Sequence, residues 1–278
     1  MQKVSLDQSQ SLLPIYEEPV KCSELRKYAL SNGKPRNLSR EFDVLTDLTI
    51  KNHESKQSAG LVEGSLYSSY DTSHLIQLCG VKGVAPIYAR KGPYSQDVAS
   101  FWQDLNEKDC KVVVCLTEVS HRHSSWGIAC YWDPVALQNF KENQVQINMI
   151  ERKALSSNLG QCKIGYTLGQ SSGTVKHLHF EDFPDLGVPS SYEELSIMIN
   201  VIIEELNALK GNGKVLMHCR SGIGRTGKQQ LKEGVKDPLI SIFSILRQLR
   251  DQRMWLCETS QQYKFVYGFV IDWIDKNL

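Results

Sequence analysis

Beyond the first third of the chain, apolar positions recur with the periods of strands and helices. Residues 86–93 predict a strand that ends in a Gly-Pro turn, and residues 111–117 form an apolar run typical of a buried strand. Between them, residues 96–105 carry apolar side chains at helical spacing, and Phe101 and Trp102 are expected in the core. Further strands are predicted at 145–150, 162–168 and 174–180.

Helices dominate the chain after residue 190. Residues 190–193 form a capping-box pattern, and the apolar stripe that follows predicts a helix ending before Gly211. A short strand is predicted at 214–217, and two more helices at 240–252 and 262–274. Strands clustered first and helices later predict an α/β (α+β) fold, in which a central twisted mixed sheet is flanked by helices.

The first third of the chain shows no comparable periodicity. Residues 1–36 mix Ser, Gln, Pro and Lys, and we expect an N-terminal extension that packs on the domain, with a short helix near 23–31. The pattern stays unclear as far as residue 80, and polar loops such as 51–60 are expected there. The sequence therefore predicts an extension at 1–36 and a main domain at 37–278.

Composition narrows the possible classes of partner. The chain has 278 residues and a net charge of +1, so no overall field favours binding to nucleic acid or to a membrane surface. No apolar run approaches the length of a membrane span, and the N-terminus lacks the apolar core of a signal peptide. We expect a monomer without an integral membrane segment.

The cysteines point to a reducing compartment. All 8 are scattered without a Cys-x-x-Cys pair, which predicts neither a disulfide framework nor a zinc site. Cysteines that form neither disulfides nor a zinc site favour a cytoplasmic location. His121 and His123 have no third ligand at suitable spacing, so neither a metal nor a cofactor is expected.

One stretch combines an anion site with a nucleophile. A short apolar run leads into Cys219, and a glycine-rich segment follows that reaches Arg225. Gly222 and Gly224 free the backbone of this segment, so that successive N–H groups can point at one tetrahedral anion. The Arg225 guanidinium can then hold two oxygens of that anion. The same positive groups favour the thiolate form of Cys219, which is the nucleophilic form.

Residues 218–227 resemble the signature loop of the cysteine-dependent protein tyrosine phosphatases. The resemblance implies that Cys219 is the nucleophile, that Arg225 clamps the phosphate and that Thr226 stabilises the leaving thiolate. His218 is expected to fix the loop geometry through hydrogen bonds. The loop residues expected to bind the substrate are Arg220, Ser221, Gly222, Ile223 and Gly224. A buried structural cysteine, the alternative, explains neither the glycines nor the arginine.

The resemblance extends over roughly residues 84–276. Residues 180–189 resemble the mobile acid loop of the family, with Phe183 in place of its tryptophan. Asp185 would protonate the departing phenol, because phenoxide is a poor leaving group. A solvated aspartate in a proline-bounded turn is the structural alternative. Residues 131–134 resemble a Tyr-Trp-Pro element of the family, with one inserted residue.

Residues 258–265 resemble the glutamine loop that positions water for the second chemical step. Gln262 matches the second glutamine of that loop, whereas Glu258 stands where the first is expected. A carboxylate can orient water, but its charge repels a phosphoryl group and would slow this step. A capped helix N-terminus is compatible with the same residues. After Gly227, about two turns of the family's helix are missing, either because the helix is truncated or because residues are omitted from the sequence.

These features predict a protein-tyrosine phosphatase that hydrolyses phosphotyrosine in proteins through a cysteinyl-phosphate intermediate. Phosphotyrosine-containing proteins are therefore the expected partners. A dual-specificity or phosphoinositide phosphatase would share Cys219 and Arg225 and is one alternative. A catalytically weak phosphotyrosine-binding pseudophosphatase is the other, favoured by Phe183, Glu258 and the short helix after the signature loop.

The N-terminal third departs from the family. Its Asn-Arg-Tyr motif, whose tyrosine walls the phosphotyrosine pocket, has no counterpart here, and Phe42, Tyr67 and Tyr70 are the candidates for this role. This divergence resembles the secreted bacterial effector phosphatases. An effector of that type would act in the cytoplasm of a host cell.

Overall fold

A computed structural model describes residues 6–30, 37–59, 74–76, 87–117, 119, 128–137, 145–210, 213–219 and 239–277. The chain divides into two compact units. Unit 1 comprises Met1–Ser69, Leu78–Gly80 and Gly227–Leu278, and unit 2 comprises Tyr70–Gln77 and Val81–Thr226.

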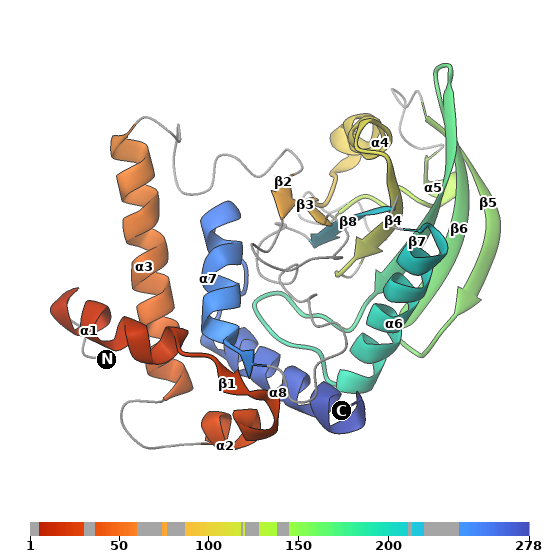
Figure 1. The fold of residues 1–278 in the computed structure, drawn as a ribbon. Helices are drawn as coiled ribbons and strands as arrows, with labels where there is room; N and C mark the ends of the chain where they lie inside the picture. Colours follow the sequence, from red (N-terminus) through yellow and green to blue (C-terminus); the bar gives the residue numbers. More distant parts are fainter. Residues whose placement is uncertain are drawn as a thin grey trace. The chain divides into compact units, whose positions relative to one another are not determined.

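Unit 2 is built on a seven-stranded mixed sheet (Figure 1). Its strands are β2 (His74–Ile76), β3 (Ile87–Lys91), β4 (Cys110–Cys115), β5 (Val145–Ala154), β6 (Leu159–Leu168), β7 (Ser171–Phe180) and β8 (Lys214–Cys219). Their order across the sheet is β2-β3-β8-β4-β7-β6-β5. The four central strands β3, β8, β4 and β7 run parallel, and the outer strands pair antiparallel. The predicted mixed sheet is confirmed.

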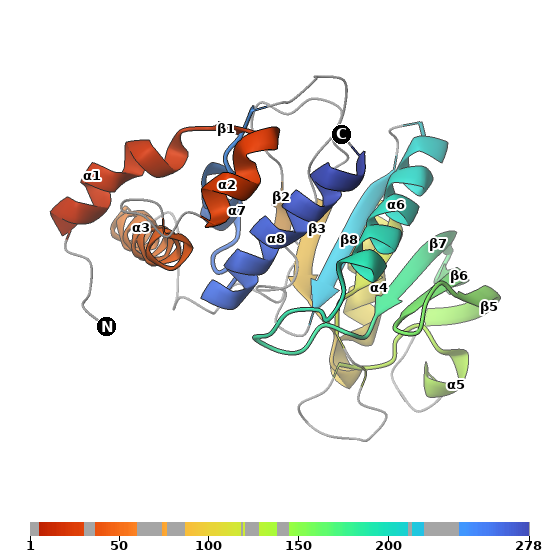
Figure 2. The same ribbon diagram turned by 90° about the horizontal axis from the view of Figure 1, so that it is seen from below.

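Two helices cover opposite faces of this sheet (Figure 2). They are α4 (Val98–Glu107) and α6 (Tyr192–Ala208), and the short α5 (Pro134–Leu137) lies beside β5. On the α6 face, Lys176 of β7 forms an ion pair with Glu205. Helix α6 is capped by Ser191, whose hydroxyl accepts a hydrogen bond from the N–H of Glu193, one residue later than the capping box predicted for residues 190–193.

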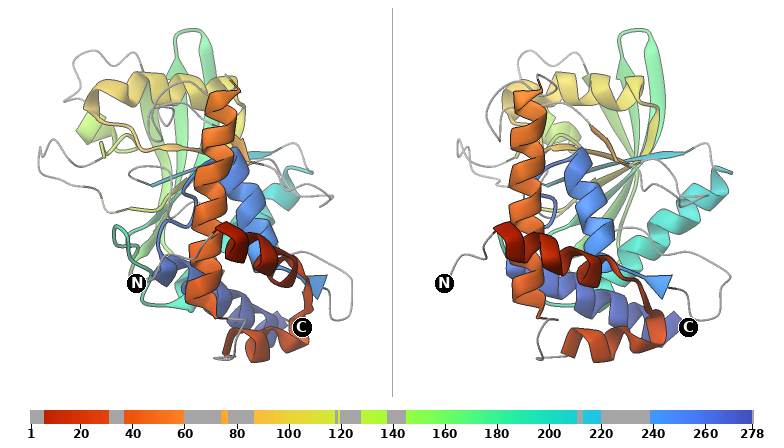
Figure 3. Two further views of the ribbon diagram at one scale, coloured as in Figure 1. Left: turned by 90° about the vertical axis from the view of Figure 1, so that its left-hand side faces the viewer. Right: turned by 60° about the vertical axis from the view of Figure 1, so that its left-hand side comes forward.

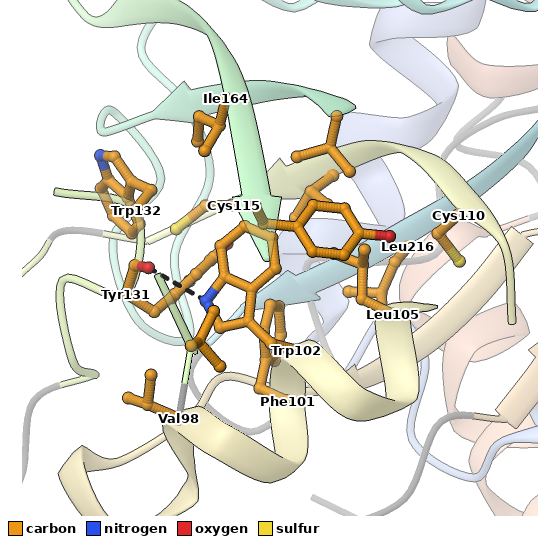
Figure 4. Packing of buried hydrophobic residues seen from close by; sticks show 14 of the residues in the cluster. Val98, Phe101, Trp102, Leu105, Cys110, Cys115, Tyr131, Trp132, Ile164 and Leu216 are labelled. Atoms are coloured by element: carbon orange, nitrogen blue, oxygen red, sulfur yellow. Dashed lines mark hydrogen bonds between the residues drawn. The ribbon is translucent and has the colours of Figure 1, made fainter. Parts of the chain in front are cut away.

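The α4 face holds the main aromatic core of unit 2 (Figure 4). Phe101 and Trp102 are fully buried there, as predicted from helical spacing. The indole N–H of Trp102 donates to the carbonyl of Tyr131 over 3.2 Å, so the polar group of this buried side chain has a hydrogen-bond partner within the core. Residues on alternate positions of β4, such as Val113 and Cys115, pack against these rings.

Unit 1 is mainly helical. Its elements are α1 (Leu6–Glu17), β1 (Val20–Lys21), a 3₁₀ turn at Cys22–Glu24, α2 (Leu25–Leu30), α3 (Leu38–Ser58), β9 (Leu239–Ile240), α7 (Ile242–Gln252) and α8 (Ser260–Asn277). Figure 3 shows α3 and α7 side by side, and α3 also contacts α8. Strand β1 pairs antiparallel with β9, which ties the N-terminal residues to the start of α7.

A buried carboxylate holds three helices of unit 1 together. Glu41 of α3 is completely buried, and its oxygens accept hydrogen bonds from the hydroxyls of Tyr28, Tyr263 and Tyr267. Burial raises the pKa of both Tyr263 and Tyr267 well above the usual value, so these phenols keep the protons that they donate. The cluster therefore joins α2, α3 and α8.

Helix α3 corrects one prediction. Residues 51–58, expected in a polar loop, are its last turns. They hold no apolar stripe and are instead fixed by polar contacts, such as the bond of the Asn52 amide to Asp251 and that of the Lys56 ammonium to the Asp251 carbonyl. The side chain of Asn37 caps the other end of the helix. Tertiary contacts thus override the polar pattern.

Several predictions concern residues that the structure does not describe. Among them are residues 220–226 of the signature loop, the shortened helix after Gly227, and His121, His123, Tyr67 and Tyr70. Within the described part of the chain, no group of His, Cys, Asp and Glu side chains is arranged to hold a metal ion. None of the described helices is both long and apolar enough to cross a membrane.

Candidate active site

Strand β8 brings Cys219 to the carboxyl end of the parallel part of the sheet. It lies between β3 and β4, with Cys219 opposite Lys91 and His218 opposite Cys115. Cys219 is completely buried. Ligands of open parallel sheets bind beyond this end of the strands, so the position suits a reacting group. Arg220, Ser221, Gly222, Ile223, Gly224, Arg225 and Thr226 follow it and lie outside the described residues.

The Gly-Pro turn after β3 holds the backbone of Cys219. The N–H of Gly92 donates to the Cys219 carbonyl over 2.8 Å. A Cβ atom at Gly92 would lie 2.8 Å from this carbonyl oxygen and 2.7 Å from a methyl group of Ile128. Only glycine allows these two backbone segments to approach each other so closely.

We expect Gly92→Ala to lower the free energy of unfolding by about 1–3 kcal/mol, because the added methyl group must displace the backbone of Cys219. Gly160→Ala is the matched control, since a Cβ atom there meets nothing within 4 Å. Chemical denaturation of both variants measures the difference. Equal stabilities would contradict the tight approach at Gly92.

A buried chain of three side chains supports His218. The hydroxyl of Tyr131 lies 2.6 Å from Nε2 of His218 and 2.9 Å from Nε2 of His177. All three side chains are buried, and Trp132 stacks on the His177 ring with centroids 4.4 Å apart. The role in loop geometry expected for His218 therefore involves two further residues, which come from the loop before α5 and from β7.

The proton positions in this chain follow from its acceptors. Nδ1 of His218 lies 3.4 Å from the carbonyl oxygen of Cys219, which can only accept, so this nitrogen carries hydrogen. Its Nε2 then accepts from Tyr131, whose phenol is kept neutral because burial raises its pKa well above the usual value. The phenol oxygen in turn accepts from Nε2 of His177. This assignment leaves Nδ1 of His177 as a bare lone pair, and that atom has no hydrogen-bond partner among the described residues.

His177 should make stability depend on pH. Burial, and then the nearby His179, His218 and Arg152, hold the pKa of His177 well below its usual value. The unfolded chain therefore binds a proton here below about pH 6.5, whereas the folded chain does not. The stability that neutral His177 contributes is complete above this pH and is lost as the pH falls below it.

We expect the free energy of unfolding to fall by up to about 1.4 kcal/mol per pH unit below pH 6.5 through this group. In His177→Gln the new side chain supplies an amide N–H donor but does not titrate. The free energy of unfolding of this variant should therefore fall less steeply over the same pH range. Denaturation between about pH 5 and 7 compares the slopes. Identical slopes would show that His177 titrates alike in both states.

The acid loop follows β7 and exposes Asp185. Phe183, which stands in place of the family's tryptophan, is buried and meets Phe180 edge to face with centroids 6.4 Å apart. Asp185 lies beyond it, in a turn closed by a hydrogen bond of 3.1 Å from the N–H of Gly187 to the carbonyl of Pro184. Leu186 takes a left-handed conformation in this turn, with φ of 57°. The buried ring of Phe183 anchors the loop, whereas Asp185 is exposed.

Polar contacts brace both ends of this loop. The Asp182 carboxylate accepts hydrogen bonds from the N–H and the hydroxyl of Ser190, which join the start of the loop to its end. His179, just before the loop, contacts the carbonyl of Thr117 at 2.9 Å and the carboxylate of Glu181 at 3.2 Å. Its ring therefore links the loop entrance to the end of β4.

Cys219 and the acid loop emerge at the same edge of the sheet. Both β8 and β7 run parallel to β4, and residue Cys115 of β4 faces His218 on one side and His179 on the other. Two strand spacings, about 10 Å, therefore separate the ends of β8 and β7. A loop of the length that follows β7 can span this distance.

Glu258 and Gln262 belong to unit 1, at the start of α8. The side-chain carbonyl of Gln262 accepts from the N–H of Glu258 over 2.8 Å and from that of Thr259 over 3.4 Å. The hydroxyl of Thr259 accepts in turn from the N–H of Gln262, as a helix cap does. Gln262 is buried, whereas Glu258 is partly exposed. The capped helix start expected as the alternative reading of this segment is present.

Comparison with known proteins identifies the family. Residues 72–272 match the model of the protein-tyrosine phosphatase family. The chain belongs to the protein-tyrosine phosphatase family. It is therefore a member of a family of phosphoric monoester hydrolases, as its signature loop indicated. Its fold agrees with that of a solved structure of PTPN18 in complex with HER2-pY1248 phosphor-peptides, with a TM-score of 0.66 and 21% identity over 85% of this chain and 99% of the other.

Curated phosphatase relatives match most of the chain. It is 29% identical to mouse receptor-type tyrosine-protein phosphatase alpha over 67% of its own length, and 32% identical to human receptor-type tyrosine-protein phosphatase R over 64%. Human tyrosine-protein phosphatase non-receptor type 18 is 27% identical over 87%. The chain spans 23%, 27% and 52% of these relatives. Their mammalian origin gives no support to the bacterial effector type.

Two contributors to the site were not predicted from sequence. In the sequence, Tyr131 belongs only to a family element, and His177 is only one position of the predicted strand at 174–180. The inward-facing position of His177 in that strand was the available signal, because a buried histidine needs a partner. Phe42, a candidate for the pocket wall, is buried in unit 1, where its ring centroid lies 5.6 Å from that of Tyr263.

Proposed function

We propose that this chain hydrolyses phosphotyrosine in proteins through a cysteinyl-phosphate intermediate. In the first step the Cys219 thiolate attacks phosphorus and the bond from phosphorus to the phenol oxygen breaks. Arg225 and the amides of residues 220–224 hold the other phosphate oxygens, and Asp185 gives its proton to the departing phenol. Thr226 and His218 support the thiolate and the loop around it.

In the second step a water molecule attacks the phosphorus of the cysteinyl phosphate. Asp185, now ionised, takes a proton from this water, and the Cys219 thiolate leaves with inorganic phosphate as the other product. Gln262 orients the water, with a contribution from Glu258. Neither step needs a metal or a cofactor, because Arg225 and the loop amides supply the positive charge that the phosphate requires.

The observation that carries this proposal is the placement of Cys219 and the acid loop at one edge of the sheet. Nucleophile and acid must approach opposite ends of the same bond, and the two strand ends that carry them flank β4. Membership of the phosphatase family and the exposed carboxyl group of Asp185 support the same reaction.

Hydrolysis of a phosphotyrosine peptide, beside phosphoserine and phosphoinositide controls, tests the proposal. We expect release of inorganic phosphate from the phosphotyrosine peptide alone. Comparable rates on phosphoserine would favour the dual-specificity alternative, and preference for the lipid headgroup would favour the phosphoinositide alternative. Either result would overturn the proposed specificity.

A catalytically weak phosphotyrosine-binding protein is the second candidate. Glu258 favours it, because its carboxylate stands where a glutamine is expected and its charge repels a phosphoryl group. Binding of a phosphotyrosine peptide by folded protein without phosphate release would establish this role.

We further propose that the chain acts as a monomer in the cytoplasm, on phosphotyrosine-containing proteins. The described cysteines are all free thiols, which supports a reducing compartment. A thiolate nucleophile also requires one. Light scattering of the purified chain tests the monomeric state, and imaging of the tagged protein tests the location.

A further inference from the structure

Arg250 is a buried arginine that none of the proposed chemical steps uses. It lies near the end of α7 and is only 3% exposed. Its guanidinium carbon lies 5.1 Å from the ring centroid of Phe42 and 5.9 Å from that of Trp255. Burial lowers its pKa from the usual value, but a guanidinium starts so high that it stays charged. A buried charge of this kind needs good hydrogen-bond partners.

Two of these partners are consecutive backbone carbonyls just before Glu258. Nε of Arg250 donates to the carbonyl of Leu256 over 2.9 Å, and one terminal nitrogen donates to the carbonyl of Cys257. The other terminal nitrogen lies 3.2 Å from the hydroxyl of Thr46 in α3. The planar fork of the guanidinium suits two adjacent acceptors. Arg250 thus fixes the bend between α7 and α8.

The bend needs such support because its backbone is strained. Trp255 and Cys257 have φ angles of 66° and 63°, in the left-handed region that side chains other than glycine rarely adopt. Each such residue costs about 1–3 kcal/mol, and the surrounding contacts must offset that cost. The two carbonyls held by Arg250 lie within and directly beside these positions.

The same peptide group is held at its other end by Gln262. The carbonyl of Cys257 and the N–H of Glu258 belong to one planar peptide unit, so the direction of one sets the direction of the other. Arg250 binds the carbonyl of this unit, and the side chain of Gln262 accepts from its N–H over 2.8 Å. Arg250 therefore helps to fix, through a single rigid group, the direction in which the carboxamide of Gln262 is turned, and the N–H of Thr259 donates to the same oxygen.

We propose that Arg250 is a positioning residue for the hydrolysis of the cysteinyl phosphate. The inference rests on the proposed function, in which Gln262 orients the attacking water. Arg250 is expected to affect the second step alone, since the first step uses Cys219, Arg225 and Asp185. When the carbonyl of Cys257 is released, the peptide unit turns, and the Gln262 carboxamide loses its fixed direction.

The two steps can be measured separately with Arg250→Met, which keeps much of the side-chain volume but no donor. Rapid mixing with an aryl phosphate follows phenol release in the first step, and acid quenching traps the phosphoenzyme to follow its breakdown. We expect breakdown to slow about tenfold, with phosphoenzyme formation unchanged within about twofold. Phosphoenzyme should therefore accumulate, and kcat should fall while kcat/KM does not.

Two further variants complete the comparison. Arg250→Lys keeps the charge, but its ammonium cannot fork onto two carbonyls, so breakdown should again slow. Arg247→Met is the matched control, because Arg247 lies on the same helix with a side chain 37% exposed and pairs with Glu17. Its kinetics should equal those of the wild type. Formation and breakdown falling together in Arg250→Met, or breakdown unchanged, would overturn the inference.

A readout that does not depend on turnover separates this inference from the proposed function. Cys257 is 2% exposed, and its alkylation by iodoacetamide should speed up in Arg250→Met, while buried Cys115 in unit 2 stays protected. Wild type that releases no phenol would overturn the proposed function and the kinetic role together. Unchanged labelling of Cys257 would instead show that Arg250 does not hold the bend, whatever the activity.

Discussion

Cys219→Ser is expected to abolish phosphate release from a phosphotyrosine peptide, by at least about four orders of magnitude. A serine hydroxyl keeps the size of the side chain but is not ionised near neutral pH, so the covalent intermediate does not form. Peptide binding should survive, because the groups that would hold the phosphate are unchanged. Phosphate release and peptide affinity, measured on the same preparation, test both expectations.

Cys115→Ser is the matched control for this substitution. Cys115 is as buried as Cys219, but it lies within β4, where its thiol faces the aromatic core. Its replacement should reduce stability and leave the rate constant of the folded fraction unchanged. Residual turnover by Cys219→Ser, above that of a mock preparation, would refute the assignment of the nucleophile.

Asp185→Ala is expected to lower kcat on the phosphotyrosine peptide by about 10²–10⁴-fold, because general acid catalysis contributes an effect of that size. The loss should be smaller on an aryl phosphate whose phenol is more acidic, since such a phenol leaves with less help from an acid. Steady-state kinetics on a series of aryl phosphates measures this dependence. The fold should be unaffected, because Asp185 is exposed.

Asp182→Ala separates the acid from its neighbour in the same loop. Asp182 binds Ser190 and braces the loop, so its loss should affect all aryl phosphates alike. Equal dependence on the leaving group in Asp185→Ala and wild type would contradict the role of Asp185 as the acid.

The elements predicted best from sequence were those whose environment is uniform along their length. Strand β4 is buried on both faces, so its continuous apolar run was visible in the sequence. Helix α4 carries its apolar residues on one side and was recognised for the same reason. The last turns of α3 were missed, because their stability comes from contacts with residues such as Asp251, about two hundred positions away.

The candidate site divides in a similar way. The signature loop, Asp185 and Gln262 follow from local motifs, in which residue type and spacing are both informative. The chain from His177 through Tyr131 to His218 could not be predicted, because His177 and His218 lie 46 and 87 positions from Tyr131 and His177 belongs to no motif. The hydrogen bonds of Arg250 to two carbonyls depend on the left-handed backbone of Trp255 and Cys257. This conformation cannot be predicted from their residue types.

The buried carboxylate of Glu41 bears on how the chain can be divided for engineering. Seen as sequence, residues 1–36 resemble an attachment that can be exchanged or trimmed. Tyr28, however, supplies one of the three hydroxyls that solvate Glu41, and the other two come from the helix that begins beside Gln262. A shortened protein would have to replace that donor with water. The N-terminal region is thereby tied, through one carboxylate, to a helix more than two hundred residues later in the chain.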